Sequence, residues 1–122
     1  KLCPVIAIVP YSTFDNAVAM AKANLLVEGA GHSAALHSND DENIKMAGLE
    51  LPISRLVVNQ PSSTTAGGSL TNGFAPTTTL GCGSWGGNSI SENLDYKHLM
   101  NVSRIGRVIA DKEVPSDEEI WA

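Results

Sequence analysis

The residue types that could do chemistry gather in and beside one glycine-rich stretch, from Gly67 to Asn93. Seven of the eleven glycines of the chain lie there, and the stretch contains Gly-Cys-Gly-Ser-Trp-Gly at positions 81–86. These letters match the G-x-G-x-x-G pattern, which binds a dinucleotide when it follows a buried strand and opens a helix. The preceding Phe-Ala-Pro-Thr-Thr-Thr is a poor strand, and Gly87 and Asn88 delay any helix. The pattern therefore favours a turn-rich segment in which backbone approaches a neighbouring element closely.

Cys82 is the candidate nucleophile of this stretch, because its small neighbours expose the thiol. Activation of a thiol needs a nearby cation or a helix N-terminus, and His32 and His98 are candidates by residue type. The alternative is a small apolar group in a tight turn, which the pattern favours. Cys3 is expected to be a buried residue at a strand edge. The two cysteines and three histidines have no zinc-like spacing, so no metal site is predicted.

His32 and Asn59 are placed where parallel sheets carry functional side chains. His32 follows two glycines and precedes an apolar run, so it can lie at the mouth of a sheet and donate to a carbonyl oxygen or relay a proton. Asn59 ends another apolar run and can orient a ligand. Each has a structural alternative: a hydrogen bond within the fold for His32, and support of the following loop for Asn59.

The elements that must position these residues follow one another as strand, helix, strand, helix, strand. The pattern predicts strands from Val5 to Val9, from Ser33 to His37 and from Arg55 to Asn59. It predicts a helix over residues 13–28, with Ser12 as N-cap and Gly29 after its end, and a second helix capped by Asn39 or Asp40 and stopped by Pro52. This alternation predicts an α/β fold with a mostly parallel sheet of three core strands and flanking helices.

The glycine-rich stretch is expected to be an ordered wall of a pocket beside these strands. Apolar anchors are spaced through it, which fits disorder poorly: Leu70, Phe74, Leu80, Trp85 and Ile90. Weak helical character follows over residues 91–100, then a final strand from about Val102 to Ile109 and a solvated tail over residues 111–119.

The composition of the chain argues against several classes of protein. The chain of 122 residues carries a net charge of -5, which argues against non-specific binding of nucleic acid. It has no apolar stretch long enough to span a bilayer, so no membrane partner is expected. Two cysteines form no disulfide framework, which indicates a reducing cytoplasm. Because the chain begins at Lys1 rather than at methionine, we expect it to be cut from a longer one.

The stretch from Thr79 to Asn93, TLGCGSWGGNSISEN, resembles the C-terminal signature of CoA-acylating aldehyde dehydrogenases. The group includes the propionaldehyde, succinate-semialdehyde and sulfoacetaldehyde types and the aldehyde half of bifunctional alcohol/aldehyde dehydrogenases. Further matches extend the resemblance over nearly the whole chain: Pro4-Val5, EGAGHSA over residues 28–34, RLVVN over residues 55–59 and KHLMN over residues 97–101. The resemblance implies that the chain is the C-terminal part of an aldehyde dehydrogenase catalytic domain.

The family oxidises an aldehyde to an acyl-CoA with NAD, through attack by a cysteine and release of the acyl group to CoA. In the family this cysteine and the cofactor-binding domain lie upstream of the matched stretch, so Cys82 is not given the nucleophile's role and the chain alone is expected to be inactive. The resemblance implies a supporting role for His32, a substrate or CoA channel bordered by Asn59, Phe74, Thr79 and Cys82, and a nicotinamide pocket edged by Leu2 and Cys3. It also implies a homo-oligomer joined through the strand near Val102 to Ile109, in the cytoplasm or in a bacterial microcompartment.

Two other functions are compatible with the residues alone. An independent binding or assembly module would have a glycine-rich stretch that surrounds no pocket, and fully covered apolar faces. A small thiol enzyme would pair Cys82 with His98, and its thiol would react with iodoacetamide faster than free cysteine does.

Overall fold

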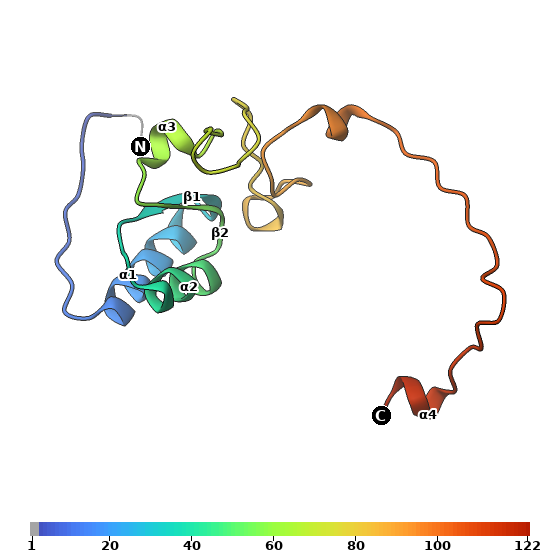
Figure 1. Ribbon diagram of the computed structural model, residues 1–122. Coiled ribbons are helices and arrows are strands. Elements are labelled where there is room, and N and C mark those ends of the chain that lie inside the picture. Colours follow the sequence, from blue (N-terminus) through green and yellow to red (C-terminus); the bar gives the residue numbers. More distant parts are fainter. Residues whose placement is uncertain (1–2) are drawn as a thin grey trace.

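The computed structural model describes residues 3–122, in which two helices and a two-stranded parallel sheet form the packed body (Figure 1). Helix α1 covers Phe14–Val27 and helix α2 covers Asp41–Glu50. Strands β1, Gly31–Leu36, and β2, Ile53–Val58, pair in parallel, with Ser33 opposite Arg55. The described residues also contain four shorter helices: α3 Ser62–Thr65, η1 Ser84–Gly86, η2 Tyr96–Leu99 and α4 Asp117–Ile120.

Both long helices begin where side chains can cap them. The N-cap of α1 is Thr13, whose hydroxyl accepts a hydrogen bond from the Asn16 amide at 3.2 Å, and not Ser12 as the sequence predicts. Thr13 serves because its backbone is extended at φ -137° and its hydroxyl reaches the third residue of the helix. Asp40 caps α2 as predicted and accepts from the Glu42 amide at 3.0 Å.

The apolar core lies between α1, α2 and the sheet. Its buried members are Val18, Ala47, Leu51 and Ile53, against which Phe14, Leu25, Leu36 and Leu56 also pack. In Figure 1 α1 and α2 lie together on one side of the sheet, while α3 and the glycine-rich stretch lie on the other. The apolar core that stabilises the fold therefore lies on the helical side of the sheet, and the loops lie on its opposite side.

The sheet has two strands where the sequence predicts three core strands and a final one. The residues from Val5 to Val9 are in no strand and are exposed, with Ile8 at 88% exposure. The stretch from Val102 to Ile109 is likewise exposed and irregular, and it forms an arm that leaves the body (Figure 1). The prediction of a core strand from Val5 to Val9 is wrong for residues 3–122, and the stretch from Val102 to Ile109 forms no strand within that range. A strand needs a neighbour to bond its backbone, and residues 3–122 provide none at these two places.

The C-terminal third contains less helix than predicted. Residues 91–100 include only the short 3₁₀ helix η2, and the exposed tail contains only the single turn α4. Within the described part of the chain, no helix combines the length and hydropathy needed to cross a bilayer.

The terminal extensions give the molecule an unusually large surface. The chain exposes 9881 Å², whereas a compact monomer of 12.8 kDa exposes about 6,300 Å². Many of the exposed large apolar residues lie in these extensions, among them Val5, Ile6, Ile105, Val108 and Val114. The apolar faces are therefore not fully covered, contrary to what an independent module requires.

Candidate functional site

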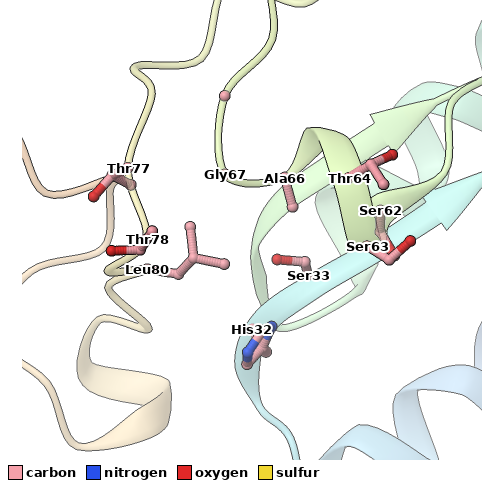
Figure 2. Close-up of a pocket in the computed structure, with 11 residues that line it drawn as sticks. His32, Ser33, Ser62, Ser63, Thr64, Ala66, Gly67, Thr77, Thr78 and Leu80 are labelled. Carbon is pink, nitrogen blue, oxygen red and sulfur yellow. The ribbon is translucent and has the colours of Figure 1, made fainter.

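A cavity of about 510 Å³ lies between β1, α3 and the glycine-rich stretch. Figure 2 shows Ser33 of β1 facing Leu80 across this space, with His32 at its edge and Ala66 beside it. The remaining lining is mostly hydroxyl groups from α3 and the loop: Ser62, Ser63, Thr64, Thr77 and Thr78. The expectation that the glycine-rich stretch forms an ordered wall beside His32 is thus confirmed.

Close backbone packing shapes this wall. Gly68 has a φ of +100° and lies so close to Pro76 that a Cβ would overlap the proline backbone, while the Thr77 amide donates to the Gly67 carbonyl at 2.8 Å. Asn93 joins the two arms of the loop, because its buried side chain donates to the Ala66 carbonyl at 3.0 Å and to the Ala75 carbonyl at 2.8 Å. The loop is held by backbone contacts more than by its apolar anchors, since Leu70 is fully exposed and Trp85 is 56% exposed.

A second cavity of about 520 Å³ adjoins the other side of His32. The C-terminal end of α1 and the loop residues Cys82, Trp85, Gly86 and Asn88 line it. Cys82 is half-buried, its amide donates to Asn88 Oδ1 at 3.1 Å, and its thiol lies 3.9 Å from the Leu80 carbonyl oxygen. His32 therefore borders both cavities and shares the second with the thiol.

His98 is engaged elsewhere. Its Nε2 lies 3.0 Å from Glu92 Oε1 and its Nδ1 lies 2.9 Å from the Asp95 amide nitrogen, which fixes the ring in the cap of η2. The lining of the Cys82 cavity does not include His98. These contacts oppose a thiol enzyme built on Cys82 and His98.

The other predicted site residues lie outside the first cavity. Asn59 follows β2, Phe74 lines a third cavity with Arg55, and the Thr79 carbonyl accepts from the Leu94 amide at 3.1 Å. Cys3 is exposed and belongs to no strand, so the prediction of a buried strand-edge residue is wrong. Leu2 lies outside the described residues.

Sequence reasoning missed most of the hydroxyl lining. Ser62, Ser63 and Thr64 come from α3, which follows β2 and lines the cavity together with residues at the amino end of β1. The signal available in the sequence was a Pro-Ser-Ser-Thr-Thr run just after an apolar strand.

Asn59 supports the loop between β1 and α2. Its Oδ1 accepts from the Ser38 amide at 3.0 Å, and its Nδ2 donates to the Ser38 carbonyl at 2.9 Å and to Asn39 Oδ1 at 3.3 Å. Its backbone is in the left-handed region at φ +54°, which asparagine tolerates better than most residues. Asn59 therefore supports a loop, but it is the loop before α2 and not the loop after Asn59 that the sequence suggested.

Replacing Asn59 by alanine is expected to lower the free energy of unfolding by about 1–3 kcal/mol, through lost hydrogen bonds and a strained φ. Asn59→Gly keeps the backbone relaxed and loses only the bonds, so its loss is expected to be smaller. Urea unfolding followed by circular dichroism measures both. Equal losses in the two variants would show that the φ of this position carries no cost.

No protein-family model matches the chain. The succinate-semialdehyde dehydrogenase (acetylating) of Clostridium kluyveri is 66% identical over 121 residues, which are 99% of this chain and 26% of that protein. A crystal structure of a probable aldehyde dehydrogenase from Listeria monocytogenes superposes with a TM-score of 0.81 at 38% identity, over 98% of this chain and 25% of that one. An acetylating aldehyde dehydrogenase from Geobacillus thermoglucosidasius superposes with a TM-score of 0.71 at 32% identity, over 85% of this chain and 22% of that one.

The chain is similar, over nearly its whole length, to part of the CoA-acylating aldehyde dehydrogenases. It spans about a quarter of the length of the relatives named above. The predicted resemblance is confirmed, and the α/β body corresponds to part of an aldehyde dehydrogenase structure.

The resemblance to aldehyde dehydrogenases implies NAD, and the glycine pattern is the place in this chain to test for a nucleotide cradle. No strand leads into Gly81, and only the three-residue helix η1 follows. A Cβ on Gly81 would meet the Ile90 carbonyl, and one on Gly86 would meet Cys82, so the glycines accommodate neighbouring protein atoms. These residues do not fit a pyrophosphate, and the closely packed turn that the sequence favours is confirmed.

A charge cluster centred on the exposed Glu92 lies at the end of the glycine-rich wall. Glu92 pairs with Lys97 Nζ at 2.8 Å and with His98 Nε2 at 3.0 Å. Hydrogen bonds from Lys97 and then from His98 hold the pKa of Glu92 below its ordinary value of 4.5. Within residues 3–122, no group of histidine, cysteine and carboxylate side chains is arranged to hold a metal ion.

Acid is expected to weaken this cluster. Because the pKa of Glu92 is lowered in the folded chain, its contribution to stability is present above pH 4.5 and is lost as the pH falls through the lowered value. The effect is small, since the pair is exposed and salt screens it. Urea unfolding of wild type and Glu92→Gln between pH 7 and pH 3 measures it, with Glu113→Gln in the tail as control. Parallel pH profiles for wild type and Glu92→Gln would contradict the prediction.

Proposed function

We propose that this chain is the C-terminal part of the catalytic domain of an NAD-dependent, CoA-acylating aldehyde dehydrogenase. The parent reaction is aldehyde, CoA and NAD giving acyl-CoA, NADH and a proton. The single observation that carries the proposal is 66% identity, over 99% of the chain, to a succinate-semialdehyde dehydrogenase (acetylating). The same similarity favours a short aldehyde that bears a carboxylate as the substrate.

In this proposal the chain contributes one wall of the acyl-transfer site, which is the cavity beside His32. The imidazole can accept the proton of the CoA thiol, or it can donate a hydrogen bond to the thioester carbonyl oxygen. The hydroxyls of Ser33 and Thr78 can bond to the same oxygen, while Leu80 supplies apolar surface on the opposite side. The nucleophilic cysteine and the nucleotide-binding domain are assigned to the part of the parent that these 122 residues do not span.

The exposed apolar extensions support a larger assembly. The surface in excess of a compact monomer is roughly 3,600 Å², which is of the order that obligate interfaces bury. We assign the arm from Val102 to Ile109 to a strand that pairs with a second subunit or with the rest of the parent, because its backbone groups have no partner strand among residues 3–122.

A chimera tests the proposed function. The matching 121 residues of the Clostridium kluyveri enzyme are replaced by this chain, and NADH formation from succinate semialdehyde is followed with and without CoA. We expect CoA-dependent NADH formation within about tenfold of the native relative, because two thirds of the exchanged residues are identical in the two proteins. A folded chimera of native oligomeric state that forms no NADH would refute the proposal and favour a non-catalytic module.

The chain by itself is expected to form no NADH under the same conditions. Appreciable turnover by the 122-residue polypeptide alone would mean that the nucleophile and the nucleotide site are both present in it, which would overturn the assignment of roles given above.

A further inference from the structure

A buried arginine on β2 has no charged partner within the described part of the chain. Arg55 is 3% exposed, and its side chain lies against β1, where Nε donates to Ser33 Oγ at 3.1 Å and Nη2 donates to the carbonyls of Gly31 and His32 at 3.5 and 3.4 Å. These three acceptors are uncharged. Nη1 has no hydrogen-bond partner among residues 3–122, and no carboxylate of that range lies within 4.0 Å of the guanidinium.

Arg55 lines a cavity of about 320 Å³, separate from the one beside His32. Its lining also includes Phe74 and Ala75 from the glycine-rich stretch, together with Ser54, Asn93 and Lys97. Two further buried polar atoms of this wall have no partner within the described chain: the Ser54 hydroxyl and Asn93 Oδ1. All three unsatisfied side-chain atoms that the structure records therefore belong to residues around this one cavity.

The net charge of the side chains around the cavity favours binding of an anion. Arg55 and Lys97 are cationic, and Glu92 is the single carboxylate of the lining. Glu92 is 55% exposed and its two oxygens are taken by Lys97 and His98. A guanidinium is always protonated, and a buried charge without a counter-charge is costly. The cavity consequently carries one positive charge that residues 3–122 do not neutralise.

We propose that this cavity is a binding site for an oxyanion, a carboxylate or a phosphate group, that pairs with the guanidinium of Arg55. A planar guanidinium matches both groups geometrically. Phe74 covers the apolar part of the ligand.

The anion can be a free small molecule or a carboxylate side chain from protein outside these 122 residues. The chemistry at Arg55 is the same in both cases, and the inference does not rest on the proposed dehydrogenase activity. Its experiment measures binding, so it can fail while the chimera is active, and it can succeed while the chimera is inactive.

The test is a nuclear magnetic resonance titration of the 122-residue chain with sodium phosphate and sodium succinate, against sodium chloride at equal ionic strength. We expect a saturable shift of the Arg55 Nε–Hε signal and of the Ser54 amide, with no shift at Arg104 in the arm. Arg55→Lys keeps the charge but loses the planar fork, and it is expected to weaken binding about tenfold or more. Arg104→Lys is the matched control and should bind as wild type does.

A crystal structure of the chimera grown with phosphate is a second test of the anion site. It does not depend on the folding of any variant. An oxyanion bonded to Arg55, whether phosphate or a carboxylate of the surrounding protein, supports the proposal, and its identity settles the source. The proposal is overturned if Glu92 has turned to pair with Arg55, or if Nη1 bonds only to neutral groups. Equal, unsaturated shifts with all three salts would overturn it as well.

Discussion

Replacing Gly31 by alanine is expected to destabilise the chain by about 2–6 kcal/mol, which is much of the 5–15 kcal/mol that holds a typical domain together. Gly31 opens β1 with a φ of +82°, in the left-handed region that side chains rarely adopt. A Cβ built on it would overlap the carbonyl group of Cys82. The φ strain costs about 1–3 kcal/mol and the forced separation of two backbone segments costs a similar amount.

Two other glycines serve as matched controls for this prediction. Gly87 has a φ of +70° but open space around its Cβ position, so Gly87→Ala is expected to cost only the φ strain, about 1–2 kcal/mol. Gly106 has neither constraint, and Gly106→Ala should change stability by less than about 0.5 kcal/mol. Urea unfolding of the three variants measures the series. A loss at Gly31 no larger than that at Gly87 would show that the Cys82 carbonyl moves aside freely.

Replacing His32 by alanine in the active chimera is expected to lower kcat about 100-fold or more, with a smaller change in the KM for the aldehyde. His32 borders both the hydroxyl-lined cavity and the cavity that contains Cys82. Loss of a positioned acid or base commonly costs 10²- to 10⁴-fold, and the corresponding limb of the pH–rate profile disappears with it. This prediction rests on the proposed function and is measured only in a chimera that forms NADH.

His32→Gln and His37→Ala separate the roles that a histidine can have here. Glutamine keeps hydrogen-bonding capacity without titrating, so it should restore kcat if His32 only orients a carbonyl oxygen and should fail if it transfers a proton. His37 is exposed, follows the end of β1 and borders neither cavity, so its alanine variant should behave as wild type. A His32→Ala chimera with wild-type kcat would reduce His32 to a passive part of the wall.

Local signals made the helices and the parallel strand pair predictable from the sequence. Asp40 and Pro52 bound α2, Gly29 follows α1 with a φ of +108°, and apolar runs mark β1 and β2. The position of His32 beside the glycine-rich wall followed from the same order of elements. These features depend on short-range chemistry, which a single sequence expresses directly.

Features that depend on distant partners could not be predicted. The apolar run from Val5 to Val9 has the composition of a buried strand, but a strand forms only where a neighbour completes its hydrogen bonds. Arg55 looked like the polar start of an apolar strand, and nothing in its sequence neighbours shows that its guanidinium is buried against β1. Likewise, the hydroxyl lining is assembled from α3 and from Thr77 and Thr78, which only the folded loop brings together.

The large exposed surface of the arm and of the N-terminal segment also affects how cooperatively the chain denatures. A compact protein of 12.8 kDa would hide about 12,300 Å² relative to its unfolded chain, whereas this one hides about 8,700 Å². Denaturant m-values and the heat capacity of unfolding scale with that difference. Both should therefore be about 70% of the values usual for this chain length, which makes the transition broad.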